Sequence, residues 1–189
     1  EWFYSGGGKE LLRPVGERNN FYYLGVSTLL GENIWSNKKI ESLEDFKGLK
    51  IRTAGLTAES LSKFGASPVS MASEDIYTGM QRGTIDAFEF VSTPVHYGFG
   101  WHEVTKYVIN PKFTMGGSSD WIVNLDSWNA LPDDLKEIVD NSLRAASDDF
   151  FVQSRLEEGE IVKKLEEAGV EFLTWPEGEI EKFEKARYE

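Results

Sequence analysis

Two charged residues occupy positions from which they could bind a ligand. Arg52 ends the alternating segment Leu49–Thr53, directly before a glycine-containing loop. A guanidinium at the carboxyl end of a strand can hold a carboxylate with two hydrogen bonds, at the sheet edge where α/β proteins bind ligands. Glu89 lies between Phe88 and Phe90, and a carboxylate in such apolar surroundings must be paired or hydrogen-bonded. Each residue also has a structural interpretation, because either one could belong to an ion pair that serves only the fold.

The residue types that catalytic and metal sites require are scarce. The chain has no cysteine and only two histidines, His96 and His102, which excludes thiolate zinc sites, a cysteine nucleophile and a multi-histidine metal site. It contains no glycine-rich nucleotide loop, nucleophile elbow or zinc-protease motif. Gly6–Gly8 and the acidic pairs at 133–134 and 148–149 indicate a tight turn and solvated charges, with anion or metal binding as the alternative. These patterns predict neither catalytic residues nor metal ligands.

Aromatic residues follow Glu89 closely. Residues 91–101 are rich in aromatic side chains and include a proline, so they could form one wall of a pocket. Trp35 and Trp101 also suit the protein core, where large aromatic side chains most often lie. We interpret the two histidines as ordinary polar contacts.

Composition and charge limit the classes of partner. The chain has 189 residues, of which 40% are hydrophobic and 28% charged, so it can build a core. Its 20 basic and 32 acidic residues give a net charge of −12, which argues against a nucleic acid or an anionic membrane as partner. There is no run of about 18 apolar residues that would predict a transmembrane helix, and no signal peptide is recognised. The chain begins on the aromatic cluster Trp2–Tyr4, which we interpret as a cut from the middle of a longer protein.

The segment that carries Arg52 and Glu89 predicts alternating strands and helices. Strands are expected at 21–26, 33–36, 49–53, 68–71 and 85–90, with helices at 57–64 and 74–82. Helices between successive strands imply parallel pairing in an α/β sheet. Ser42 and Asp45 approximate a capping box that starts one further short helix, which ends at Gly48.

The second half of the chain predicts one long helix. Strands are expected at 103–110, 119–124 and 170–175, and helices at 132–168 and from Glu177 onward. The helix at 132–168 would be roughly 50 Å long. Its apolar stripe shifts near Phe151 to Val152 and Leu156, which indicates that the helix packs against two bodies or kinks.

Several segments resemble the periplasmic solute-binding subunits of TRAP transporters, the DctP type. Leu43–Arg52 resembles their stretch s-L-e-D-l-K-G-L-K-i-R, and Glu74–Ala87, continuing to Glu89, is similar to their signature e-i-Y-t-a-l-Q-r-G-t-I-D-a-a-E. Trp128–Leu135 resembles the entry to the family's long spine helix. The opening Trp2–Leu11 is similar to the branch that includes the 2-oxo acid binders.

The resemblance implies an α/β fold that is periplasmic binding protein type II-like. Such a protein has two lobes and a long spine helix, and it closes on its ligand like a hinged clamp. Residues 1–189 would be the C-terminal portion of a family member whose N-terminal part is missing. An α/β lobe would occupy about 25–90, and hinge and spine elements would occupy 91–189.

The resemblance also implies roles for four residues of the site. The family's arginine, which holds the ligand carboxylate, falls on Arg52, and its acidic residue falls on Glu89. Phe90 stands where the 2-oxo acid branch usually has a tryptophan. Together with Trp101, it would shield the ligand from solvent.

A metal ion helps to hold the ligand in the 2-oxo acid branch. The branch's glutamine would fall near Gly31 and its second glutamate at Thr114 or Met115, and these residue types do not match. We therefore expect no cofactor and no metal ion.

The implied function is that of an extracytoplasmic solute receptor without enzymatic activity. It would bind a small organic carboxylate in the periplasm and deliver it to the membrane permease subunits of a TRAP-type transporter. Two alternatives stay open. One is an α/β enzyme that uses Glu89 as a general base, and the other is an isolated fragment that binds nothing and associates into a dimer or swapped assembly.

Overall fold

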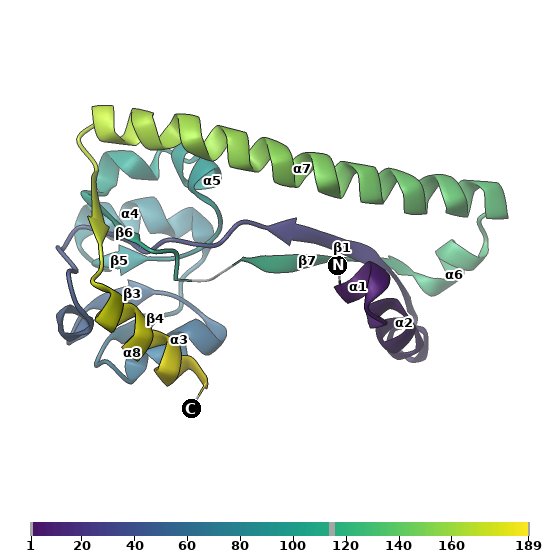
Figure 1. The fold of residues 1–189 in the computed structure, drawn as a ribbon, viewed down its shortest axis with the longest axis horizontal. Helices are drawn as coiled ribbons and strands as arrows, with labels where there is room; N and C mark the ends of the chain where they lie inside the picture. Colours follow the sequence, from purple (N-terminus) through teal and green to yellow (C-terminus); the bar gives the residue numbers. More distant parts are fainter. Residues whose placement is uncertain (1, 114–115, 189) are drawn as a thin grey trace. The chain divides into compact units, whose positions relative to one another are not determined.

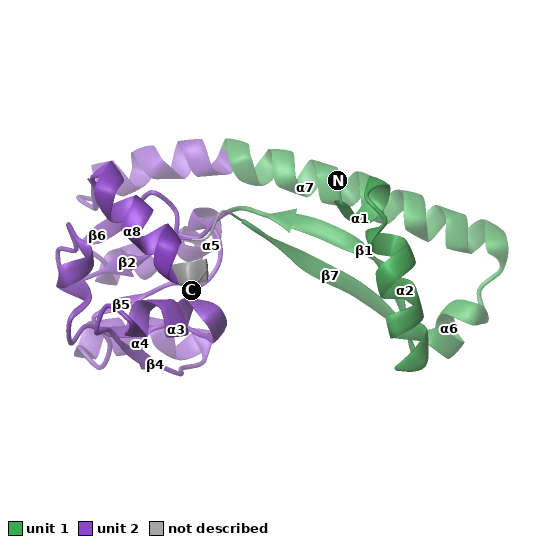
Figure 2. Cartoon of the chain, turned by 60° about the horizontal axis from the view of Figure 1, so that its bottom comes forward, with its two compact units in different colours: residues 1–30, 116–156 green, residues 31–115, 157–189 purple. Residues whose placement is uncertain are grey.

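The computed structural model describes residues 2–113 and 116–188, and it divides the chain into two compact units. Unit 1 comprises residues 1–30 and 116–156, and unit 2 comprises residues 31–115 and 157–189 (Figure 2). Each unit is thus built from two separate stretches of the chain. The division into a lobe at about 25–90 and further elements at 91–189 stays a prediction.

Unit 2 is built on a six-stranded mixed sheet with the strand order β4-β3-β5-β2-β6-β8 (Figure 1). The strands are β2 (Trp35–Ser36), β3 (Lys50–Arg52), β4 (Ser67–Val69), β5 (Ala87–Phe88), β6 (Tyr107–Asn110) and β8 (Glu171–Thr174). β3 pairs in parallel with both β4 and β5, as the alternation of strands and helices predicts. β2 pairs antiparallel with β5 and β6, and β6 pairs in parallel with β8.

The helices of unit 2 lie close to the predicted positions, with two exceptions. They are η1 (Leu43–Phe46), α3 (Gly55–Ser62), η2 (Ser73–Asp75), α4 (Ile76–Arg82), α5 (Thr93–Gly98), η3 (Trp101–Val104) and α8 (Glu177–Tyr188). Of these, α5 and η3 were not predicted. The predicted capping box is present, since the Ser42 backbone N–H donates to Asp45 Oδ2 at 2.9 Å. Gly83 ends α4 with a φ of 69°, in the left-handed region that favours glycine. The strand predicted at 103–110 is wrong at its start, because η3 occupies 101–104 and β6 begins only at Tyr107.

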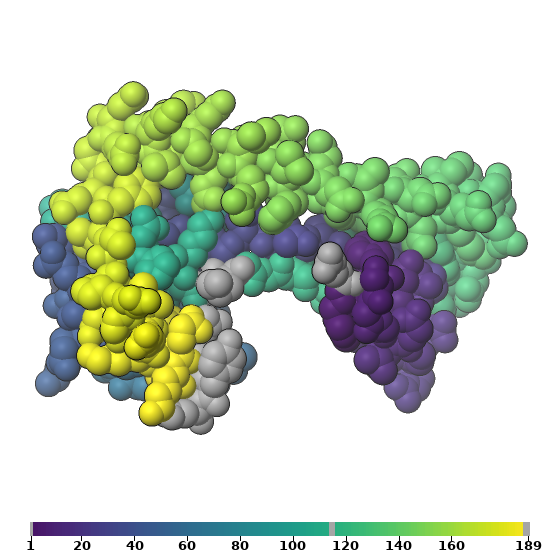
Figure 3. All heavy atoms as spheres, viewed as in Figure 1, coloured from purple at the N-terminus to yellow at the C-terminus, as the bar shows by residue number. Residues whose placement is uncertain are grey.

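The two faces of this sheet support two separate cores. Neighbouring strand residues point to opposite faces, so Ala87 belongs to one core and Phe88 to the other. The first core includes Leu61 of α3 and Phe183 of α8, and α8 lies on the surface of unit 2 in the view of Figure 3. The second includes Met80 of α4, together with η3 and the end of the long helix. The sheet is therefore covered on both faces, which is typical of an α/β unit.

Unit 1 contains a two-stranded antiparallel sheet of β1 (Phe21–Leu29) and β7 (Gly117–Asn124). Its helices are α1 (Trp2–Ser5), α2 (Gly8–Arg18), α6 (Leu125–Asn129) and the first part of α7 (Asp133–Glu167). α2 was not predicted, because Pro14 interrupts its pattern. The helix nevertheless continues through Pro14, and Gly7 before it adopts a φ of 87°.

α7 is the predicted long helix, and it contains 35 residues. Residues up to 156 belong to unit 1 and the later ones to unit 2, so the shift of the stripe near Phe151 accompanies a change of unit. The predicted stripe is wrong in detail, since Val152 and Leu156 are exposed, whereas Ser147 and Ser154 are buried. Among the helices of the described residues, none has the length and apolar character that a membrane span requires.

Candidate functional site

Arg52 lies at the carboxyl end of β3 with its guanidinium held by two backbone carbonyls. Nε donates to the Met71 carbonyl oxygen at 3.2 Å, and Nη1 donates to the Glu89 carbonyl oxygen at 2.9 Å. The guanidinium carbon lies 4.8 Å from the centre of the Phe90 ring, a cation–π contact. Neither carbonyl carries a formal charge, so these bonds fix the orientation of the guanidinium without neutralising it. The five N–H groups of an arginine leave further donors for a ligand.

The parallel pairing of β3 with β5 brings Glu89 to the same edge of the sheet. Arg52 is the register partner of Phe88, and the Glu89 backbone N–H donates to the Arg52 carbonyl oxygen at 3.1 Å. Arg52 is therefore the last paired residue of β3, and Glu89 directly follows the last paired residue of β5. This is the edge at which α/β sheets bind ligands, as the sequence predicts.

The Glu89 side chain is buried and takes part in a carboxyl pair. Thr53 Oγ1 donates to Glu89 Oε1 at 2.7 Å, and the side chain of Glu32 is hydrogen-bonded to Glu89. Burial raises the pKa of Glu32 to about 8, with the hydrogen bond and the charge of Glu89 acting in the same direction and Arg52 opposing them. Below that pH, Glu32 keeps a proton that it can share with its neighbour. The site therefore combines one guanidinium with two adjacent carboxyl groups.

Glu32 is a site residue that sequence reasoning missed. It lies in the segment between β1 and β2, where neither strand periodicity nor a flanking apolar run draws attention to it. The family resemblance offered one signal for Glu32: the glutamine of the 2-oxo acid branch was expected near Gly31, which is the residue before Glu32. The second expected position, Thr114 or Met115, lies outside the described residues.

Phe90 and Trp101 form an aromatic layer beside the guanidinium. Phe90 contacts Arg52 directly, and the ring centres of Phe90 and Trp101 are 5.9 Å apart. Trp101 is almost fully buried and also packs on Phe88 and Phe99. The structure thus brings Phe90 to Arg52 and places Trp101 behind Phe90. A contact between Trp101 and a ligand stays a prediction.

His96 is buried within the same aromatic layer. Its side chain is 0% exposed, and its ring packs on Trp35, Phe88 and Trp101. The Val91 backbone N–H donates to His96 Nε2 at 3.2 Å. Burial, and to a lesser extent the charge of Arg52, lowers the pKa of His96 to about 3. The imidazole is therefore neutral at physiological pH.

The described residues contain no complete set of metal ligands. Among residues 2–113 and 116–188, no group of three or more histidine, cysteine, aspartate or glutamate side chains could hold a metal ion. Glu32 and Glu89 form a group of two, next to Arg52. Two adjacent carboxyl groups that share a proton could contribute oxygen ligands to a cation that replaces it.

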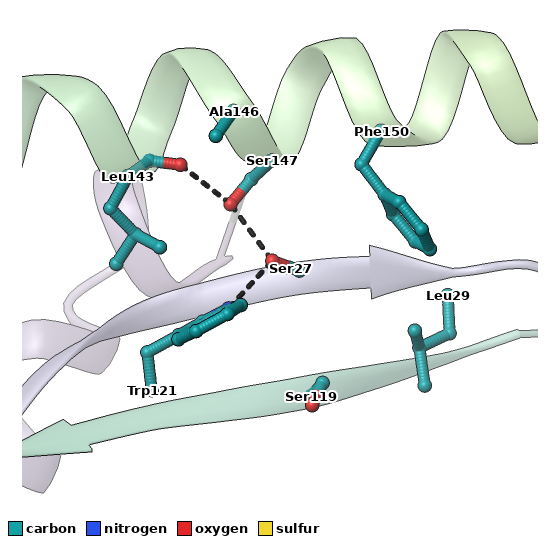
Figure 4. Close-up of a pocket in the computed structure, with 8 residues that line it drawn as sticks. All are labelled: Ser27, Leu29, Ser119, Trp121, Leu143, Ala146, Ser147 and Phe150. Atoms are coloured by element: carbon teal, nitrogen blue, oxygen red, sulfur yellow. Dashed lines mark hydrogen bonds between the residues drawn. The ribbon is translucent and has the colours of Figure 1, made fainter.

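Unit 1 contains a cavity of a different character, about 380 Å³ in volume (Figure 4). Its lining residues come from β1, β7 and α7: Ser27, Leu29, Ser119, Trp121, Leu143, Ala146, Ser147 and Phe150. Trp121 Nε1 donates to Ser27 Oγ at 2.7 Å, the Ser27 and Ser147 hydroxyls are 2.9 Å apart, and Ser147 Oγ donates to the Leu143 carbonyl oxygen at 2.8 Å. Because Ser147 donates to Leu143, Ser27 is the donor in the bond between the two serines. This chain of bonds uses the hydrogens of the indole and of both hydroxyls, and none of the lining residues carries a charge.

Comparisons with known proteins agree on one family. The family model of DctP, described as bacterial extracellular solute-binding protein, family 7, matches residues 1–189. A monocarboxylate 2-oxoacid-binding periplasmic protein of Nostoc sp. is 27% identical over 190 residues, which cover 100% of this chain and 52% of the relative. The chain therefore spans about half the length of this curated relative.

Solved structures of TRAP periplasmic solute-binding proteins have the same fold. One from Colwellia psychrerythraea, with bound calcium and pyruvate, is 32% identical with a TM-score of 0.85, over 99% of this chain and 58% of that one. Another, from Pseudoalteromonas atlantica with bound sodium and pyruvate, is 31% identical with a TM-score of 0.83, again over 99% and 58%. These matches confirm the predicted α/β fold of the periplasmic binding protein kind.

Proposed function

The chain belongs to the DctP family of bacterial extracellular solute-binding proteins, as its motifs predict, and on this premise we propose that it binds a small organic carboxylate through Arg52. One observation carries the proposal: the guanidinium is oriented by two uncharged carbonyls and by the Phe90 ring, and it keeps donors for an anion. An arginine held in this way loses little conformational entropy when a ligand binds.

The neighbouring carboxyl groups restrict which carboxylates suit the site. Glu32 and Glu89 would repel a second negative charge close to Arg52, so a monocarboxylate suits this arrangement better than a compact dianion. The related proteins that bind pyruvate or monocarboxylate 2-oxo acids support this ligand class. Phe90 would cover the ligand on one side, with Trp101 behind it.

A cation would be held at the Glu32–Glu89 pair. Calcium takes roughly six to eight oxygen ligands, and two carboxyl groups supply only part of such a shell. When bound, a cation would add positive charge beside the ligand. We derive no step through it, and the assignment of the ligand carboxylate to Arg52 does not depend on it.

The role in transport follows from the family. We propose that the protein acts in the periplasm, delivers its ligand to the permease subunits of a TRAP-type transporter and has no catalytic cycle. The related periplasmic binding proteins support this role. Glu89 accepts a hydrogen bond from Thr53 and pairs with Glu32, which suits a binding role better than that of a free general base.

Calorimetry of pyruvate binding, with and without calcium chloride, tests the proposal. Malonate serves as the dianion for comparison. We expect pyruvate to bind more tightly than malonate, and Arg52→Ala to weaken pyruvate binding by about tenfold or more, since truncation of a buried charged partner costs several kcal/mol. Arg82→Ala is the matched control, because Arg82 is exposed at the end of α4. Unchanged affinity in Arg52→Ala would remove Arg52 from the site.

A further inference from the structure

Two consecutive residues, Glu89 and Phe90, hold the guanidinium of Arg52 together with the Met71 carbonyl. The Glu89 carbonyl accepts a hydrogen bond from Arg52 Nη1, and the Phe90 ring packs against the guanidinium. The next residue, Val91, donates its backbone N–H to His96 Nε2. The segment 89–91 lies beyond the end of β5, and its first residue, Glu89, still donates its backbone N–H to the Arg52 carbonyl oxygen of β3, whereas the Val91 N–H donates to His96. A side chain that anchors this segment therefore also fixes the position of the arginine.

His96 contacts the segment in two ways. Its Nε2 atom accepts the Val91 N–H, and its ring lies 5.1 Å from the Trp101 ring, which in turn packs on Phe90. The backbone and the aromatic side chain of the segment are thus both supported from the same imidazole.

The second nitrogen of His96 argues against a merely space-filling role. Nε2 accepts a hydrogen bond, so the proton of the neutral ring resides on Nδ1. In the described part of the chain, Nδ1 is buried and has no hydrogen-bond partner. An unsatisfied buried donor is costly, and a phenylalanine would fill the same aromatic environment without it. The hydrogen bond to Val91 is what a histidine adds at this position.

We propose that His96 is a positioning residue for Arg52: as a neutral imidazole with its proton on Nδ1, it anchors residues 89–91 through the Val91 N–H and thereby sets the orientation of the guanidinium. The effect of His96 on ligand binding rests on the proposed function. The anchoring of Arg52 itself is a property of unit 2 and can be measured without any ligand.

The first test measures the anchor by NMR. In the ¹⁵N-labelled protein we expect His96 to show a protonated Nδ1 and an unprotonated Nε2, and a protonated Nε2 would overturn the proposal without any variant. His96→Phe should speed hydrogen exchange of the Val91 amide and of the Arg52 Nη1–H, which donates to the Glu89 carbonyl, by about tenfold or more, because both lose their fixed geometry. The amides of Ile51 and Val108, in the strands of the same sheet, should keep their protection. Equal loss of protection across the sheet, or unchanged exchange at Arg52, contradicts positioning.

The conservative variant separates the hydrogen bond from the packing. Glutamine carries an amide oxygen that can replace Nε2 as acceptor, so His96→Gln should restore protection of the Val91 amide and the Arg52 Nη1–H to a large part of the wild-type value. His102→Phe is the matched control, because His102 stacks on Tyr97 and not on the segment that holds Arg52. If His96→Gln exchanges its hydrogens as fast as His96→Phe does, the effect comes from packing of the imidazole ring. That result would overturn the role of the hydrogen bond.

The second test uses pyruvate as the probe, with calcium chloride present. We expect His96→Phe to weaken pyruvate binding by about threefold to tenfold, as is typical when a residue that orients a binding group is lost, and His96→Gln to recover most of it. If the wild-type protein does not bind pyruvate while the exchange pattern is as expected, the proposed ligand class fails and the positioning role stands. If pyruvate binds and hydrogen exchange at Arg52 is the same in His96→Phe as in the wild type, the positioning role fails and the receptor function stands.

Discussion

The Arg52 site of unit 2 and the cavity of unit 1 are both lined by strand residues and aromatic rings. They differ in whether hydrogen-bond donors and charge are still available to a ligand. Both place strand residues beside aromatic rings, and both contain hydrogen-bonded polar groups. In the cavity, the Trp121 indole and the hydroxyls of Ser27 and Ser147 use their hydrogens on one another and on a carbonyl. Around Arg52, the guanidinium donates to two uncharged carbonyls, and its charge acts on the nearby Glu32 carboxyl group.

This difference indicates which region has the capacity to bind a polar ligand. A network whose donors are all used gains little from an anion, because each new hydrogen bond must replace an existing one. A charged group that is fixed in orientation and not neutralised gains the full charge-assisted interaction. The Arg52 site differs from the cavity because it keeps a positive charge and N–H donors that a ligand can use. Both regions are polar, so polarity alone does not separate them.

The largest expected effect separates the two regions by ligand binding. Arg52→Lys keeps the positive charge but replaces the planar fork with a point charge, so we expect pyruvate binding to weaken by roughly 1–3 kcal/mol, less than in Arg52→Ala. Ser147→Ala, in the cavity, should leave the affinity unchanged. Calorimetry on the two variants provides the measurement. Wild-type affinity in Arg52→Lys would mean that the site recognises the ligand by its charge alone and does not need the planar guanidinium.

The second expected effect is the pH dependence of stability contributed by His96. The pKa of His96 is lowered from 6.5 to about 3 in the folded protein, so the unfolded chain binds the extra proton between these values. The contribution of His96 to stability is therefore fully present above about pH 6.5 and is lost as the pH falls toward 3, with a slope of up to about 1.4 kcal/mol per pH unit.

Urea unfolding of the wild type and His96→Gln between pH 4 and 8 measures this contribution. The variant lacks the titrating group, so its stability should approach or exceed that of the wild type as the solution becomes more acidic. His102→Gln shows the general effect of removing one imidazole. Parallel curves for the wild type and His96→Gln would contradict a neutral, buried His96.

A smaller effect is expected from the serine network of unit 1. Ser27 is buried, and Ser27→Ala removes the acceptor of the Trp121 N–H and the donor to Ser147. We expect a loss of stability of about 1 kcal/mol, because Trp121 is half-exposed and its N–H can turn to water. Denaturant unfolding measures the loss, with Ser119→Ala as the control at an exposed position that also lines the cavity. A loss as small as that of the control would show that the network adds nothing to stability.

The sequence predicted the site where the backbone pattern alone determines it. Arg52 and Glu89 end two parallel strands, and the parallel pairing follows from the intervening helices, so their meeting at one edge could be inferred. The place of Phe90 beside Arg52 was implied by the family resemblance, and its role at a ligand stays a prediction. The predicted short helix at Ser42–Gly48 and the helix that ends at Gly83 were confirmed, since a cap and turn glycines mark their ends.

Residues brought in by loops could not be inferred in this way. Glu32 reaches Glu89 from a segment without periodicity, and His96 reaches Val91 through a turn of a short helix. In unit 1, the helix through Pro14 was not predicted, because proline is a strong local signal against a helix interior. Buried Ser147 of α7 was missed because a hydroxyl satisfied by a distant partner looks like a solvent-exposed residue in the sequence.

The smallest expected effect concerns Glu32, and its sign is opposite to that of His96. The pKa of Glu32 is raised from 4.5 to about 8 in the folded protein, so the folded chain binds the extra proton between these values. Its contribution to stability is fully present below about pH 4.5 and is lost as the pH rises through 8. Because Glu32 is only half-buried, solvent screening reduces the effect.

Glu32→Gln removes this titration but keeps a hydrogen-bonding group beside Glu89. The stability of the variant relative to the wild type should therefore increase as the pH rises from about 5 to 8, and Glu137→Gln, at an exposed position on α7, reports the effect of losing any one carboxylate. Calcium chloride sharpens the comparison: a cation held by Glu32 and Glu89 would replace the shared proton and stabilise the wild type more than the variant at pH 8. If urea unfolding gives the same pH slope for the wild type, Glu32→Gln and Glu137→Gln, then Glu32 does not hold a proton beside Glu89 in the folded protein.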